Sequence, residues 1–277
     1  MHEKDLVEQI TGKIREFRKE IVEITYKTKQ AHIGSALSCV DVIAALYLGI
    51  LKVNPKFPKN ENRDRFILSK GHGCVALYPV LAERGFFKKE ALRTFNQSKS
   101  MLGGHPDMHK VLGIEASTGS LGHGLSIGIG MAIAGKVDRK DYRVFVILGD
   151  GECQEGSVWE AVMAASHFRV DNLIAVIDNN GLQLLGFINN VSSYLQPLSE
   201  KFKAFGWEVI EVDGHDVEKI LKTLRKVPFK KGRPSCVIAH TVKGKGISFM
   251  EGRPECHFRG LTEDERIQAL KEIEEKY

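Results

Sequence analysis

The sequence has few cysteines and lacks any pairing pattern among them. Only five occur in its 277 residues, and no two form a CxxC pair. Scattered cysteines of this kind are typical of free thiols in a reducing compartment, and they argue against a disulfide scaffold or a zinc ribbon. We therefore expect a cytoplasmic protein.

Long apolar runs are also scarce. No run approaches the roughly 20 residues of a membrane span, and the charged start, MHEKDLVEQ, has no apolar signal core. The net charge is only +5, and the basic run at residues 226–233 reads as a solvated loop. We expect neither a membrane nor a nucleic acid partner.

The composition predicts a folded core. Hydrophobic residues make up 43% of the chain and charged residues 27%, which excludes a disordered protein. We predict a single domain over residues 1–277, with an N-terminal helical segment at 1–60 and a C-terminal helix at 262–276. Helical spacing recurs early, at Ile10, Ile14, Phe17, Ile21 and Ile24.

Two helix starts carry capping signals. Ser38 with Asp41 three residues later predicts a helix over 38–51, and Thr262 with Glu265 predicts the start of the last helix.

The second half alternates between strand and helix patterns. Runs of β-branched residues predict strands at 143–148, 173–177, 207–212 and 235–240, with helices at 157–168, 198–205 and 217–227. Strands and helices in series predict an α/β fold, in which a parallel sheet carries helices on both faces in three layers.

Polar motifs follow two of these strands. Gly149-Asp150-Gly151 ends the first, and Asn179-Asn180 ends the next. If the strands are neighbours, Asp150 and Asn180 meet at the edge where open α/β sheets bind ligands. A carboxylate and an amide oxygen suit Mg²⁺ or Ca²⁺, and glycines let a bulky anion approach the backbone. The motif therefore predicts a metal–diphosphate clamp.

The spacing of these motifs is the thiamine diphosphate signature. GDGECQEG followed by IDNN resembles the diphosphate-binding half of transketolase, and further motifs in the same order extend the resemblance over nearly the whole chain. The resemblance implies the thiamine diphosphate-binding fold and a metal held by Asp150, the Asn180 side chain and the Leu182 carbonyl. It further implies cofactor contacts from His72, Gly119, Leu121, Gly149, Gly151 and Glu155, of which Glu155 faces a neighbouring domain.

Four histidines lie in transketolase-like motifs. His32 lies in AHIG, His72 in SKGH and His105 in GGHPD, while His257 ends HTVKGKGISFMEGRPECH. By resemblance these are the catalytic residues that line the substrate channel. Imidazole suits that role, because it can donate or accept a proton near neutral pH.

The resemblance covers only the first part of a full-length transketolase. It implies the N-terminal subunit of a split, two-chain enzyme that transfers a two-carbon ketol unit from a ketose phosphate to an aldose phosphate. The partner would be a C-terminal, pyrimidine-binding subunit that supplies the activating glutamate, in an α2β2 assembly. Alternatives are the α subunit of a 2-oxo acid dehydrogenase, a split transketolase for an unusual pentose phosphate, and a cofactor-binding regulatory protein without catalysis.

Three positions depart from the family pattern: Ile33, Ser120 and Phe258. Many transketolases have Pro at the first two positions and Gly at the third. We expect these departures to alter loop shape or sugar specificity more than the cofactor site. A GxSxG pattern at 124–128 resembles a hydrolase motif, but no apolar strand precedes it, and we interpret Ser126 as part of a helix.

Overall fold

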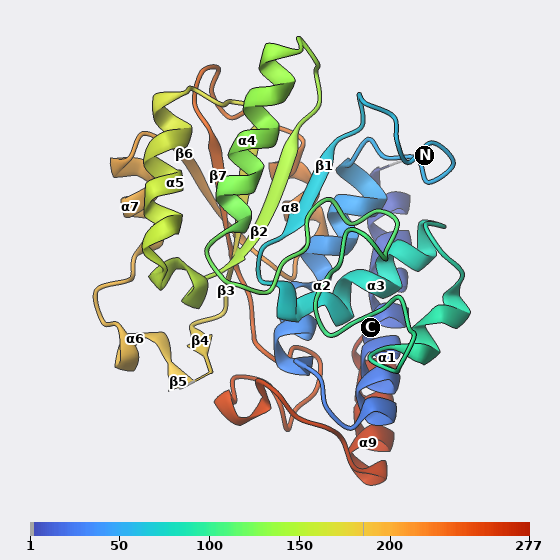
Figure 1. The fold of residues 1–277 in the computed structure, drawn as a ribbon. Helices are drawn as coiled ribbons and strands as arrows, with labels where there is room; N and C mark the ends of the chain where they lie inside the picture. Colours follow the sequence, from blue (N-terminus) through green and yellow to red (C-terminus); the bar gives the residue numbers. More distant parts are fainter. Residues whose placement is uncertain (1–2, 185) are drawn as a thin grey trace.

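The computed structural model describes residues 3–184 and 186–277, and its centre is a parallel five-stranded sheet (Figure 1). The strand order is β1-β2-β3-β7-β6. Its strands are β1 Arg65–Leu68, β2 Val144–Gly149, β3 Leu173–Asn179, β6 Glu208–Asp213 and β7 Ser235–His240. A small antiparallel pair, β4 Leu182–Gln183 and β5 Gly186–Phe187, follows β3.

Helices cover both faces of the sheet, which gives the expected three layers (Figure 1). One face carries α1 Glu3–Thr28, α2 Ile33–Ala45, α3 Cys74–Glu83, α8 Val217–Leu224 and α9 Glu263–Lys276. The other carries α4 Gly124–Val137, α5 Gly156–His167 and α7 Leu198–Ala204, and the short α6 Ile188–Val191 lies beside β5. Shorter turns are η1 Leu46–Ile50, η2 Gly71–Gly73, η3 Lys89–Thr94, η4 Gly151–Gln154 and η5 Pro254–Cys256.

The alternation of side chains along β2 explains why two layers form. Phe145 and Ile147 join the core on the side of α1 and α2. Val144, Val146 and Leu148 point to the opposite face and join the core under α4 and α5. Successive residues of a strand face opposite sides, so a continuous apolar run is buried on both faces.

Several details differ from the sequence prediction. Helix α3 was not predicted, and α8 ends at Leu224 instead of at residue 227. The strand β1, at residues 65–68, was not predicted; it is only four residues long and pairs with β2. Helix α2 begins at Ile33, so the prediction that Ser38 caps a helix at 38–51 was wrong. Ser38 and Asp41 are buried inside the helix and bond to distant residues, which outweighs their local capping preference.

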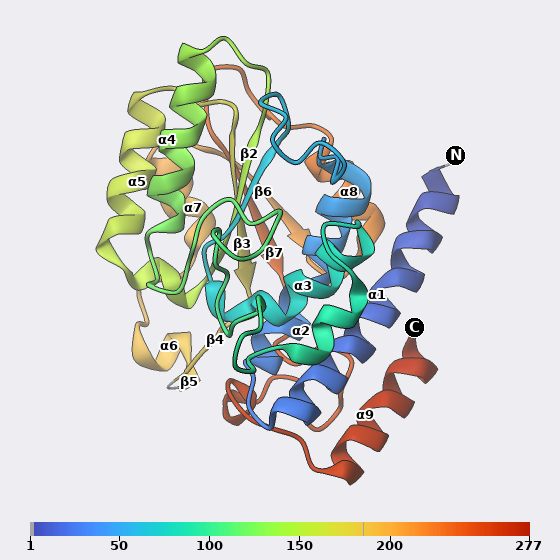
Figure 2. The same cartoon turned by 45° about the vertical axis from the view of Figure 1, so that its right-hand side comes forward.

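The apolar segment Ile33–Ile50 is long and apolar enough to cross a membrane by composition, contrary to the sequence expectation, but 83% of it is buried inside the protein. It is the core helix of this layer. The capping box at Thr262 is confirmed, with both of its hydrogen bonds formed to Glu265. Helices α1 and α9 lie side by side (Figure 2).

Candidate active site

Asp150 and Asn180 meet at the carboxyl edge of the sheet, as the sequence predicts. They follow β2 and β3, which are neighbouring parallel strands with Gly149 paired to Asp178. The Asp150 carboxylate accepts hydrogen bonds from the backbone N–H of Gly151 (2.8 Å) and of Gly181 (2.6 Å). The loop after β3 is therefore fastened to the end of β2.

A cavity of about 470 Å³ opens at this edge. Every residue that the sequence put forward for catalysis, cofactor or metal lines it. These are His32, His72, His105, Gly119, Leu121, Gly149, Asp150, Gly151, Glu155, Asn180, Leu182 and His257. The structure therefore places residues from widely separated motifs around one space.

The electrostatics of Asp150 are those of a buried carboxylate short of positive charge. Its side chain is 2% exposed. Burial, and then the nearby Asp178 carboxylate, raise the pKa of Asp150 to about 7, although the two backbone N–H groups favour the charged form. A cation bound at this carboxylate would restore the ordinary charged state.

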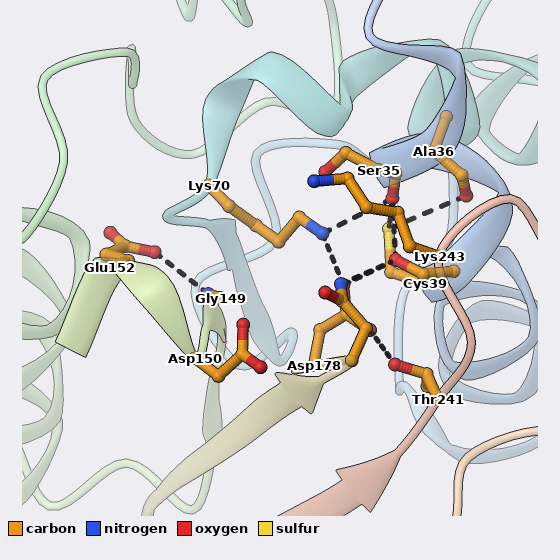
Figure 3. Close-up of polar contacts among 12 residues, drawn as sticks. Ser35, Ala36, Cys39, Lys70, Gly149, Asp150, Glu152, Asp178, Thr241 and Lys243 are labelled. Atoms are coloured by element: carbon orange, nitrogen blue, oxygen red, sulfur yellow. Dashed lines mark hydrogen bonds and ion pairs between the residues drawn. The ribbon is translucent and has the colours of Figure 1, made fainter. Parts of the chain in front are cut away.

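A buried ion pair that the sequence analysis missed lies beside Asp150. Lys70, which follows β1, donates to the Asp178 carboxylate, and both side chains are almost fully buried (Figure 3). Asp178 also accepts from Ser38 (2.6 Å) and from Thr241. Burial alone would raise the pKa of Asp178, but the Lys70 ammonium and these donors hold it below its ordinary value. The pair fixes α2, β3 and β7 against the segment after β1.

Glu152 is the second buried carboxylate without an assigned role. It accepts hydrogen bonds from the backbone N–H of Gly122 (2.9 Å) and Gly149 (3.1 Å) and from the Ser69 hydroxyl. Gly122 has φ +83°, and a Cβ there would lie 2.5 Å from Ser157 Oγ. Only glycine fits at this turn. Glu152 thus holds the loop of residues 119–124 against the end of β2.

The four predicted histidines form a compact cluster on one side of the cavity. The ring centroid of His32 lies 5.1 Å from that of His72, 5.3 Å from His257 and 6.2 Å from His105. His32 directly precedes α2, His72 lies in the η2 turn, and His257 follows η5. Segments far apart in the chain therefore contribute to one group of imidazoles.

Burial and nearby cations keep three of these imidazoles uncharged. Burial is the main cause that lowers the pKa of His32 to about 4 and that of His257 to about 3, and it also lowers the pKa of His72 well below the ordinary value. Lys70 and Lys243 add to the effect. At neutral pH these rings act as hydrogen-bond donors and acceptors without a net charge.

Lys243 is the other basic residue of the cavity that the sequence analysis left without a role. It is 2% exposed, and its Nζ lies 2.8 Å from Nδ1 of His257. Among residues 3–184 and 186–277, no carboxylate lies within ion-pair distance of it. Burial, and then Lys70, lower the pKa of Lys243 to about 8.

Other residues that the sequence analysis discussed lie at the rim of the cavity or outside it. Glu155 is the exposed N-cap residue of α5, yet its side chain makes no capping hydrogen bond. Ser126 lies in helix α4, as predicted, where its side chain is exposed. His215 bonds to Asp41 and to the backbone N–H of Val242, which is a structural role.

Three further histidines, His109, His167 and His240, do not line the cavity. His240 pairs with Glu211, while His109 and His167 are exposed. His2 lies outside the described residues.

Comparison with known proteins assigns the family. The family described as "Transketolase, thiamine diphosphate binding domain" matches residues 8–274. The chain belongs to the transketolase family. It is 46% identical over 259 residues to one of the named subunits of the apulose-4-phosphate transketolase of Phocaeicola vulgatus, covering 94% of this chain and 92% of that protein. It is 42% identical to the 6-deoxy-6-sulfo-D-fructose transketolase subunit SqwG of a Clostridium species, with 94% of each chain covered.

Full-length transketolases match only over their first part. Human transketolase is 37% identical over 253 residues, which is 91% of this chain but 40% of the human protein. The crystal structure of a transketolase mutant from Pichia stipitis superposes with a TM-score of 0.89 at 30% identity, covering 95% of this chain and 40% of that one. The chain is thus a subunit of the split transketolase type.

These findings bear on two of the three alternatives left open by the sequence. A transketolase subunit is an enzyme component, a transferase, and it binds thiamine diphosphate. Neither the α chain of a 2-oxo acid dehydrogenase nor a regulatory protein without catalysis finds support in the family match or in the relatives that match over nearly their full length.

Proposed function

We propose that this subunit works in a two-chain enzyme that transfers a two-carbon ketol unit from a ketose phosphate to an aldose phosphate. The observation that carries the proposal is the meeting of four histidines with Asp150 and Asn180 in one cavity. The polar edge of the sheet suits a charged diphosphate, and the histidine cluster suits a sugar chain rich in hydroxyl groups.

The residues at the sheet edge fit a divalent cation, for which we propose Mg²⁺ or Ca²⁺. Asp150 is buried, and among the described residues its carboxylate accepts hydrogen bonds from two backbone N–H groups and from no side chain, so its charge is poorly offset without a cation. Asn180 Oδ1 accepts from the backbone N–H of Leu182 at 3.0 Å, which leaves a lone pair for a metal. With the Leu182 carbonyl these atoms form the oxygen donor set that Mg²⁺ prefers, and a diphosphate would supply further oxygens.

The buried charges also fit the diphosphate itself. Lys70 is matched by Asp178, whereas Lys243 faces the cavity with His257 as its hydrogen-bond partner. An unpaired ammonium in a buried site is costly unless an anion joins it. We propose that Lys243 contacts the bound diphosphate, and that Gly149 and Gly151 let that group approach the backbone.

The chain's own residues would position the sugar. Bound thiamine diphosphate supplies the nucleophilic carbon and the electron sink for breaking the ketose C2–C3 bond. His32, His72, His105 and His257 hold the sugar hydroxyls, because neutral imidazoles can accept at one nitrogen and donate at the other. A ring with a free acceptor nitrogen can take and return the hydroxyl proton that moves as the C–C bond breaks or forms, whereas His257, whose Nδ1 accepts from Lys243, donates from Nε2.

The proposed partner is a pyrimidine-binding subunit that covers the open side of the cavity. Four large apolar side chains are exposed in the segment that follows Asn180, and the first of them lines the cavity: Leu184, Phe187, Val191 and Tyr194. Exposed apolar groups that lie close together mark a protein contact surface. Glu155, free of capping bonds at the cavity rim, would face that partner and support its activation of the cofactor.

The names of the relatives, which describe them as subunits, support a second chain, and we propose an α2β2 assembly. Two relatives are named for apulose 4-phosphate and for 6-deoxy-6-sulfo-D-fructose, so we propose a sugar phosphate or a close sugar derivative as the substrate. The five cysteines are free thiols in the structure, which supports the proposed cytoplasmic location.

The products that the enzyme forms from a ketose phosphate test this function. The chain is combined with its partner subunit, thiamine diphosphate and Mg²⁺, and is given xylulose 5-phosphate with a panel of aldose phosphates. We expect release of glyceraldehyde 3-phosphate and growth of the acceptor by two carbons. Decarboxylation of 2-oxo acids with no transfer to any sugar would contradict the proposal.

A further inference from the structure

A separate cavity lies beside β1, the strand at one edge of the sheet (Figure 1). It has a volume of about 160 Å³ and shares no lining residue with the active-site cavity. Most of its wall is apolar and includes Tyr47, Phe66, Phe86, Val111 and Ile114. The polar side chains of the wall are those of Asn54, Lys59, Arg63, Asp64 and Glu115. An apolar cavity of about 150 Å³ takes up benzene, so this space fits a single small ring.

The hydroxyl group of Tyr47 is a polar group that lacks a partner in this wall. The side chain is 3% exposed, and its ring packs edge-on against Phe66 and Phe86, with centroids 5.1 and 6.4 Å away. Nothing in residues 3–184 and 186–277 forms a hydrogen bond with the hydroxyl. Burial is the main cause that raises the pKa of Tyr47, so the group keeps its proton and can donate. Buried tyrosine hydroxyls ordinarily have a partner, and an acceptor in the cavity would supply one.

Arg63 contributes a second incompletely used donor. Its Nε donates to the Pro58 carbonyl at 2.7 Å, and its Nη2 donates to the Glu115 carboxylate at 2.9 Å. Its Nη1 is buried and has no partner within the part of the chain that the structure describes. The planar fork of a guanidinium group suits a carboxylate in particular.

The charges around the cavity favour an anion. Glu115 is offset not only by Arg63 but also by Arg65, whose Nε lies 3.9 Å from it. The carboxylate of Asp64 is paired with Arg143 at 2.6 Å. Lys59 is exposed and forms no ion pair with any described residue. Both carboxylates of the wall are therefore matched, and positive charge remains in excess.

We propose that this cavity binds a small apolar carboxylate of about the size of benzoate. The ring of the ligand lies among Phe66, Phe86 and Ile114. Its carboxylate accepts hydrogen bonds from Tyr47 and Arg63. This ligand is neither the substrate nor the cofactor of ketol transfer, and the inference does not depend on the proposed function.

Binding of benzoate to the assembled complex tests the inference. Thiamine diphosphate and Mg²⁺ are kept in excess, so that the active-site cavity is occupied. We expect calorimetry to give a Kd on the order of 1 mM or lower for benzoate. Benzyl alcohol has the same ring without the charge and should bind about tenfold more weakly. With isotope-labelled methionine methyl groups, benzoate should shift the NMR signal of Met108, which lines the cavity, and not that of Met163, an exposed residue elsewhere.

Tyr47→Phe is the most specific variant. It removes a hydroxyl that has no partner among the described residues, so the complex without benzoate should be as stable as the wild type. Benzoate should bind about tenfold more weakly, because a hydrogen bond to a charged group is lost. Tyr194→Phe makes the same change at an exposed residue outside the cavity and should leave the affinity unchanged.

Arg63→Met tests the preference for an anion. We expect the affinity for benzoate to fall to that for benzyl alcohol, while the affinity for benzyl alcohol itself stays the same. Arg93→Met removes an exposed guanidinium group outside the cavity and should keep the wild-type preference for benzoate.

Three results would overturn the inference. They are benzoate that does not bind or that leaves the Met108 signal in place, benzyl alcohol that binds as tightly as benzoate, and an unchanged benzoate affinity in Tyr47→Phe. Failure of the proposed function is a different result. A complex that binds benzoate as described but transfers no ketol unit contradicts that function and leaves this inference intact.

Discussion

The Nζ atom of Lys243 lies 2.8 Å from Nδ1 of His257, and both side chains line the cavity. At neutral pH the ammonium donates this hydrogen bond, so Nδ1 accepts and the proton of the neutral ring lies on Nε2. His257 therefore presents an N–H donor on its other side. The pair joins the proposed diphosphate end of the cavity to its histidine end.

Substitution of Lys243 tests this coupling. Burial is the main cause of the low pKa of His257, and Lys243 is the next. In Lys243→Met we expect the pKa of His257 to rise from about 3 while staying below the ordinary 6.5, because the burial remains. An NMR titration of the His257 ring measures it. Lys245→Met is the control, since Lys245 pairs with Glu251 instead; an unmoved His257 in Lys243→Met would refute the coupling.

Asp150 is expected to control metal-dependent cofactor binding. Asp150→Ala removes the anionic ligand of the proposed cation, and the diphosphate charge is then poorly neutralised in a buried site. Calorimetry on the assembled complex should show no Mg²⁺-dependent affinity for thiamine diphosphate. Asp141→Ala, an exposed carboxylate outside the cavity, should leave the affinity as it is. Unchanged Mg²⁺-dependent binding in Asp150→Ala would remove Asp150 from the metal site.

Glu152 is expected to contribute to the stability of the folded protein more than to the reaction. Glu152→Gln keeps the size of the side chain and one acceptor oxygen. Its NH₂ group cannot accept, so either the Gly149 N–H or both the Gly122 N–H and the Ser69 hydroxyl lose their partner. Leaving a buried donor unpaired costs roughly 1–3 kcal/mol of unfolding free energy. Urea denaturation measures that loss, and hydrogen exchange of the Gly122 or the Gly149 amide should speed up. If both stay at wild-type values, Glu152 does not hold the loop of residues 119–124.

The histidines at the loop positions are expected to affect turnover and not folding. His105 and His257 both lie outside helices and strands, so neither should be needed to hold the core. His105→Ala and His257→Ala should bind thiamine diphosphate normally and lower kcat by roughly 10²–10⁴-fold, the range for loss of a general acid or base. Steady-state kinetics and cofactor titrations on the complex separate the two effects. Full turnover in both variants would exclude these histidines from the substrate channel.

Local sequence patterns were enough for the main elements and for the motif residues of the site. Strand β7 occupies residues 235–240 as predicted. The strands that end at Gly149 and Asn179 are neighbours, which is the condition on which the predicted meeting of Asp150 and Asn180 depended. Such features depend on side-chain periodicity and on short connections, which a single sequence displays.

Long-range pairing could not be predicted in the same way. Lys70 and Asp178 are 108 residues apart in the sequence. Nothing in the motif around either residue indicates that it pairs with the other. Ser38 was interpreted as a helix cap because that is its usual local role, whereas its hydroxyl bonds to Asp178 from inside α2. Glu152 and Lys243 were missed because nothing in the neighbouring sequence shows what a buried charge will face.

The most direct test of the account compares this chain alone with the chain combined with its partner subunit. The cavity is accessible from solvent, and we propose that the partner supplies the carboxylic acid that activates the cofactor. With thiamine diphosphate, Mg²⁺, xylulose 5-phosphate and an aldose phosphate, we predict release of glyceraldehyde 3-phosphate only from the combined subunits. Ketol transfer by the 277-residue chain alone at rates typical of enzymes, about 1–10³ s⁻¹, would contradict the account, as would an inactive pair that binds both cofactors.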